Sequence, residues 1–141
     1  MQDIKIKDES PHCSKHVLPL VVGGLTITCE DNMELMKRYP DNYFDLAIVD
    51  PPYGIGISSN PVRQQHQKKD WDSAIPTKEY FNELFRVSKN QIIWGANYFC
   101  EFLPSGTGWL FWNKLNGLDN CFSDGEFAFS SKGVQSKYFE C

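Results

Sequence analysis

The segment Phe44-Asp45-Leu46-Ala47-Ile48-Val49-Asp50-Pro51-Pro52-Tyr53 decides the fold that we expect for this chain. Residues 46–49 are continuously apolar, which is typical of a central parallel strand buried on both faces. Two prolines follow, and because proline cannot continue a central strand, the backbone must leave the sheet after Asp50. The segment therefore predicts a buried strand with a carboxylate at its carboxyl end.

Extended and helical patterns alternate on both sides of this segment. Residues 25–29 favour a strand, and Asp31 or Asn32 suits the N-cap of a following helix. Thr77 is expected to cap a second helix that ends near residues 89–90. A short helix over residues 97–103 and strands at residues 91–94, 109–112 and 127–129 complete the pattern. This order predicts an α/β fold with a mostly parallel sheet.

Length and composition limit the class of protein. The 141 residues suit one domain, and we expect residues 1–24 to be a tail or edge segment and residues 25–141 to be the domain. The net charge of -4 excludes a uniformly basic surface for nucleic acid. Five cysteines without a CxxC pair predict reduced thiols and no metal centre. Without a long apolar run or a signal peptide, we expect a cytoplasmic protein with no membrane contact.

The end of the predicted strand suggests a particular chemistry. In open α/β sheets, ligands bind beyond the carboxyl ends of the strands, which is where Asp50 is expected. A carboxylate, a rigid carbonyl and the ring of Tyr53 together suit a planar heterocycle with an exocyclic amine. Hydrogen bonds to the amine protons favour the tetrahedral nitrogen that attacks a methyl sulfonium. A base in a duplex must first be flipped out, at a cost of about a few kcal/mol.

Several segments resemble DNA adenine methyltransferases that modify the exocyclic amine. Residues 45–56 resemble their catalytic motif, and Cys29–Glu34 is similar to a segment that precedes it in the β group, with Glu30 where glycine is usual. Phage-type and restriction-associated members of this family have segments similar to residues 86–99, 108–112 and 122–126. Where Trp-Asp-Lys is common in the family, this chain has Trp112-Asn113-Lys114. The resemblance covers about residues 26–129, most of the chain.

The resemblance implies a Rossmann-like, S-adenosylmethionine-dependent methyltransferase fold that acts on a flipped-out adenine in double-stranded DNA. Asp50 and the Pro51 carbonyl would bind the amine, Pro52 would shape the turn, and Tyr53 would stack on the base. Asp31 would contact the adenosine part of S-adenosylmethionine, unless it is only a helix cap, and Asp50 would also border this cofactor. A restriction endonuclease is a further partner that the resemblance suggests.

One part of the family pattern is missing from the sequence. The turn Phe-x-Gly-x-Gly, which holds the methionine part of the cofactor in this family, does not occur in the 141 residues. In the β group this turn lies near the C-terminus, so we expect a C-terminally truncated chain with an incomplete domain. Two alternatives stay open: a cytosine amino-methyltransferase, in which serine more often replaces Asp50, and a catalytically inactive DNA-binding fragment.

Other polar residues are weaker candidates for this site. Residues 54–72 form a long polar stretch, which predicts either a lid or a solvated linker. Asp72 could close over a ligand, and Asn97 and Glu126 could reach it. For each of them a purely structural role is at least as common.

Overall fold

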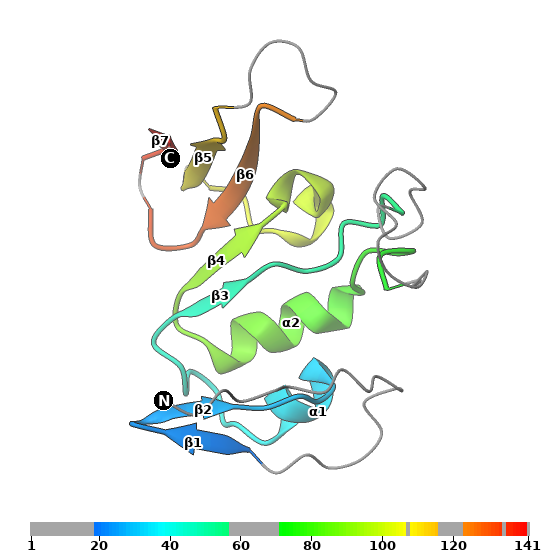
Figure 1. The fold of residues 1–141 in the computed structure, drawn as a ribbon, viewed down its shortest axis with the longest axis vertical. Coiled ribbons are helices and arrows are strands. Elements are labelled where there is room, and N and C mark those ends of the chain that lie inside the picture. Colours follow the sequence, from blue (N-terminus) through cyan, green and yellow to red (C-terminus); the bar gives the residue numbers. More distant parts are fainter. Residues whose placement is uncertain (1–18, 57–70, 107, 116–122, 134, 141) are drawn as a thin grey trace, which may run out of the picture. The chain divides into compact units, whose positions relative to one another are not determined.

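The computed structural model describes residues 19–56, 71–106, 108–115, 123–133 and 135–140. The chain forms two compact units, Met1–Arg38 and Tyr39–Cys141. The first contains a two-stranded sheet and a short helix, and the second contains a five-stranded sheet with one α-helix (Figure 1).

The first unit is built around a β-hairpin. Strands β1 (Leu20–Val22) and β2 (Leu25–Ile27) pair in antiparallel fashion. The two glycines between them, residues 23 and 24, both have positive φ, as a tight two-residue hairpin turn requires. Helix α1 (Asn32–Lys37) follows. The strand and helix predicted here are confirmed, but β2 pairs with β1, inside the segment expected to be a tail or edge.

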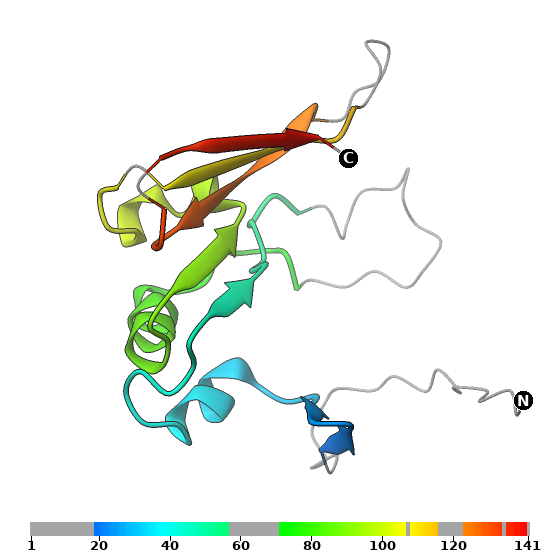
Figure 2. The ribbon, with the colours of Figure 1, turned by 90° about the vertical axis from the view of Figure 1, so that its left-hand side faces the viewer.

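The sheet of the second unit is mixed. In spatial order its strands are β3 (Ala47–Val49), β4 (Gln91–Trp94), β6 (Gly125–Ser130), β5 (Trp109–Asn113) and β7 (Lys137–Glu140). β3 runs parallel to β4 and β5 runs parallel to β7, whereas β6 is antiparallel to both of its neighbours. Figure 2 shows these strands from the side, with β5, β6 and β7 adjacent to one another.

The predicted Rossmann-like α/β fold is wrong. Half of the pairings in the larger sheet are antiparallel, the smaller sheet is an antiparallel hairpin, and the described residues contain only two α-helices. The physical reason lies in β5 and β6, which are consecutive in sequence and pair in antiparallel fashion, with a further hydrogen bond from Lys114 N to Asp124 O just beyond the paired residues. A hairpin of this kind needs no crossover helix. The apolar patterns predicted the strands themselves, but such patterns carry no strand direction.

The prediction of a central strand after Phe44 is also wrong. β3 is one of the two edge strands of the described sheet, and Ile48 is 62% exposed. The middle strand of the five is β6, and β4 lies between β3 and β6, with Ile93 fully buried. The continuous apolar character of residues 46–49 therefore predicted a strand correctly, but the central place that it indicated for this strand is wrong.

Helix α2 (Lys78–Val87) lies along β3 and β4 (Figures 1 and 2). Its buried face consists of Tyr80, Phe81, Leu84 and Val87. The apolar spacing in the sequence predicts a face of Tyr80, Phe81, Leu84 and Phe85, so three of the four residues agree. Phe81 contacts the fully buried Phe99, with 5.3 Å between ring centroids. The short helix predicted at 97–103 forms as two 3-10 turns, η3 (Ala96–Tyr98) and η4 (Cys100–Phe102). None of the helices in the described ranges has the length and apolar character to cross a bilayer.

Candidate active site

Asp50 lies at the carboxyl end of β3, as predicted, and its side chain is exposed. The two prolines that follow take the chain out of the sheet, with Pro51 buried and Pro52 half-buried. Because β3 and β4 are parallel and Val49 pairs with Ile93, the carboxyl ends of both strands meet at this edge. Asp50 is therefore presented beside the turn that follows β4.

Tyr53 folds back onto Asp50. Its hydroxyl donates to Asp50 Oδ1 with 2.6 Å between the oxygens. Burial of the ring, then the hydrogen bond and negative charge of Asp50, raise the pKa of Tyr53 well above its usual value, and Glu126 adds to this effect. The phenol therefore stays neutral at physiological pH and acts as a hydrogen-bond donor to the carboxylate.

The turn after β4 holds the ring of Tyr53 in place. Gly95 adopts a left-handed conformation with φ of 66°, and a Cβ at this position would lie 2.1 Å from Tyr53 Cε1. The ring of Tyr98 stacks on that of Tyr53, with centroids 5.0 Å apart and planes 14° apart. Sequence reasoning assigned no role to Gly95 beyond ending β4 and none to Tyr98. A glycine and an aromatic residue three positions apart directly after a strand were the only available signal.

Asp72 anchors the loop that begins at Tyr53. It is 1% exposed, its carboxylate accepts the N–H of Gly54 at 2.9 Å, and its carbonyl accepts the N–H of Gly56 at 3.0 Å. The carboxylate is therefore engaged by the backbone of the loop, which gives Asp72 a structural role. Residues 57–70, the centre of the stretch expected to be a lid or linker, lie outside the described residues.

A second charged group lies near the start of β6, beyond its pairing with the end of β4. Glu126, near the start of β6, forms an ion pair with Lys114, whose Nζ also lies 5.2 Å from the centre of a Trp112 ring. The charge of Glu126 acts on Tyr53, which makes it part of the electrostatic surroundings of Asp50. Asn113, where an acid is common in the family that the sequence resembles, accepts the N–H of Leu115 and so shapes the turn after β5.

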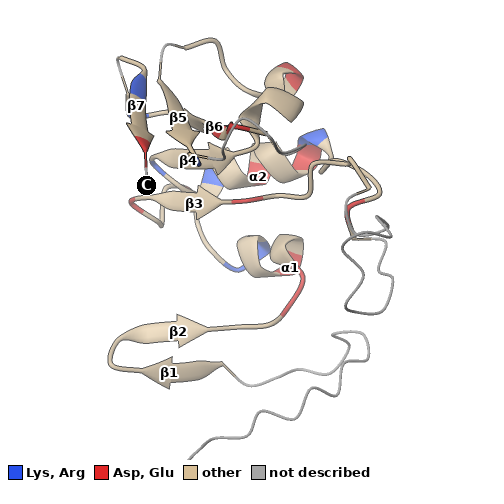
Figure 3. Cartoon of the chain, turned by 45° about the horizontal axis from the view of Figure 1, so that its top comes forward, with Lys and Arg blue, Asp and Glu red and all other residues tan. Residues whose placement is uncertain are grey.

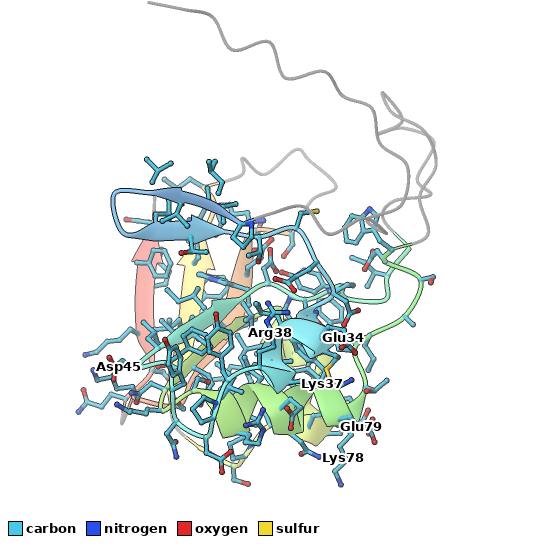
Figure 4. The ribbon with its side chains drawn as sticks, turned by 90° about the horizontal axis from the view of Figure 1, so that it is seen from below. Glu34, Lys37, Arg38, Asp45, Lys78 and Glu79 are labelled. Carbon is cyan, nitrogen blue, oxygen red and sulfur yellow. The ribbon has the colours of Figure 1, made fainter. Side chains whose placement is uncertain are left out.

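Asp31 caps helix α1. Its Oδ1 accepts the N–H groups of Met33 at 2.9 Å and Glu34 at 3.1 Å, so the predicted cap is present. Figure 4 shows the nearby Glu34 and Lys37, which form an ion pair on the same helix. Asp31 belongs to the first unit and Asp50 to the second.

Among the described residues, neither Asp31 nor the most tightly packed glycines open onto a site for S-adenosylmethionine. One oxygen of Asp31 is used by the helix cap. Among the described glycines, those at which a Cβ would clash most severely, residues 95, 108 and 125, are packed against atoms of the chain itself. A glycine cradle open to a ligand is therefore not found at these three positions.

The arrangement combines an exposed carboxylate with a stacked pair of aromatic rings. It suits a planar ligand that donates a hydrogen bond to the carboxylate and lies against a ring. Within the described ranges, no cluster of three or more metal-binding side chains occurs. No protein-family model matches this chain, and no curated protein matches its sequence.

Proposed function

We propose that this chain provides the base-binding side of a DNA methyltransferase that modifies the exocyclic amine of adenine, with S-adenosylmethionine as the methyl donor. The observation that carries the proposal is the 2.6 Å hydrogen bond between the Tyr53 hydroxyl and Asp50, which fixes an exposed carboxylate beside an aromatic ring. The sequence resemblance of residues 45–56 supports the same assignment.

Asp50 and Tyr53 would each recognise a different part of the base. Since Tyr53 occupies Oδ1, the exposed carboxylate offers Oδ2 to an N–H of the amine. The base ring would lie against Tyr53, and base–aromatic stacking of this kind contributes about 1–3 kcal/mol. The carboxylate then holds the amine in one orientation before reaction, which is a contribution of positioning and electrostatics. A keto group in place of the amine would face the carboxylate with no proton to share.

Double-stranded DNA in the cytoplasm is the proposed substrate, with the target base flipped out of the stack. Basic and acidic residues are interspersed along the described elements (Figure 3), and ion pairs engage Lys37, Arg38, Arg86, Lys89 and Lys114. The described surface therefore supports recognition of a base more than broad contact with phosphates. A restriction endonuclease partner remains a proposal from the resemblance alone.

Binding of nucleosides tests this proposal at the level of the site. The chain with labelled backbone and tyrosine rings is titrated with 2′-deoxyadenosine and with 2′-deoxyinosine, which carries a keto group in place of the amine. We expect signals of Asp50 and Tyr53 to shift with deoxyadenosine and to respond at least about tenfold more weakly to deoxyinosine, because an unpaired carboxylate costs more than about 1.4 kcal/mol.

Two variants serve as test and control in this titration. Asp50→Ala should remove the preference for the amine. Asp45→Ala removes an exposed carboxylate at the other end of β3, where it pairs with Lys89, and should leave the preference unchanged. Equal binding of the two nucleosides by the wild-type chain would refute the proposal. Tighter binding of deoxycytidine than of deoxyadenosine would favour the cytosine alternative instead.

A further inference from the structure

Tyr98 contacts the proposed site and is only partly covered by the rest of the chain. It is 43% exposed, whereas its neighbour Phe99 is fully buried and packs on Phe81 from helix α2. The ring of Tyr98 is instead stacked on Tyr53. A stack of this kind adds only about 0.5–1.5 kcal/mol, so stability alone gives little reason to place a large exposed ring here.

The position of Tyr98 has a consequence for the geometry of Tyr53. With the planes 14° apart and the centroids 5.0 Å apart, Tyr98 covers one face of the Tyr53 ring. Gly95 lies against a face of the same ring near Cε1, because a Cβ there would be 2.1 Å from Cε1 and 2.6 Å from both Cδ1 and Cζ. The hydroxyl at the far end of the ring is held by Asp50. The stack with Tyr98, the close backbone of Gly95 and the hydrogen bond to Asp50 together fix the plane of the Tyr53 ring.

We propose that Tyr98 is a positioning residue that holds Tyr53 in the plane required for stacking and restricts the base to the face of Tyr53 that Tyr98 does not cover. This inference rests on the proposed function, because it assigns a base to that face. Tyr98 would act through Tyr53 and would not itself touch the base. The turn Gly95-Ala96-Asn97-Tyr98 would thus serve the site as well as end β4.

The test measures deoxyadenosine affinity in variants of Tyr98. Tyr98→Leu removes the ring and should weaken binding by about three- to tenfold, as expected for the loss of one aromatic contact. Tyr98→Phe keeps the ring and should restore wild-type affinity. Tyr138→Leu is the matched control, since Tyr138 is also exposed and stacked, on Phe111, but lies on β7 at the opposite edge of the sheet. It should bind like the wild type.

A second measurement uses the wild-type chain and does not depend on how the variants fold. Nuclear Overhauser contacts from the protons of bound deoxyadenosine should reach the Tyr53 ring and not the Tyr98 ring. A base found between the two rings would overturn the inference, as would wild-type affinity in a folded Tyr98→Leu chain. If the wild-type chain does not bind deoxyadenosine at all, the proposed function fails and the inference fails with it. The affinity of the wild-type chain therefore distinguishes these two kinds of failure.

Discussion

Gly95→Ala is the substitution whose effect follows most directly from the geometry of the site. The new Cβ would lie 2.1 Å from Tyr53 Cε1 and 2.6 Å from Cδ1 and Cζ, whereas ordinary van der Waals contact begins at 3.4 Å. The left-handed backbone adds about 1–2 kcal/mol for an L-residue. Displacing a packed ring adds about 1–3 kcal/mol. We therefore expect the free energy of unfolding to fall by about 2–5 kcal/mol.

Urea denaturation of the wild-type chain and of Gly95→Ala measures this loss, and Gly106→Ala supplies the control. At Gly106 the nearest atom to a new Cβ is 3.7 Å away, so we expect a change within about 0.5 kcal/mol. Because the displaced ring must also move its hydroxyl away from Asp50, the pKa of Tyr53 should fall in Gly95→Ala. A loss below about 1 kcal/mol, with the Tyr53 titration unchanged, would show that Tyr53 does not rest on this glycine.

Three further outcomes follow from the same contacts. Asp72→Ala should lower the free energy of unfolding by about 2–4 kcal/mol in urea denaturation, because the N–H of Gly54 loses its buried acceptor. Asp72→Asn keeps an acceptor oxygen and should recover at least half of that loss. Equal losses in the two variants would refute the anchoring role. The contribution of Tyr53 and Tyr80 to stability should be constant below about pH 10 and should fall as the pH rises further. Burial raises the pKa of Tyr80 to about 12, and the pKa of Tyr53 is raised as well, so both ionise first in the unfolded chain. Urea midpoints across this range test that sign, and a midpoint that rises with pH would contradict it. Calorimetry should show weak or undetectable binding of S-adenosylmethionine to the 141-residue chain, which has no Phe-x-Gly-x-Gly turn, and micromolar binding would overturn this expectation.

Local structure was largely predictable from the sequence because its determinants are local. The cap at Asp31, the apolar face of α2 and the strand over residues 91–94 each depend on neighbouring residues. The order and direction of strands depend on distant pairings, such as Trp94 with Ala128, which an apolar pattern does not encode. For that reason the parallel sheet and the central place of residues 46–49 were wrong predictions.

The candidate site shows the same division. The rigid turn after Asp50 was predictable because proline acts on its own backbone and on the residue before it. The position of the Tyr53 ring was not predictable, because it depends on contacts with Gly95 and Tyr98, which lie more than forty positions further along the sequence. Likewise, the engagement of Asp72 with Gly54 turned a candidate ligand contact into a structural anchor.

Discrimination between 2′-deoxyadenosine and 2′-deoxyinosine tests the central claim most directly, because it depends on the base-binding residues and not on the methyl donor. Dissociation constants for both nucleosides are measured with the wild-type chain, with Asp45→Ala and with Asp50→Ala. We expect at least about tenfold tighter binding of deoxyadenosine by the wild-type chain and by Asp45→Ala, and no preference in Asp50→Ala. Equal binding of the two nucleosides by the wild-type chain, or an unchanged preference in Asp50→Ala, would contradict the claim.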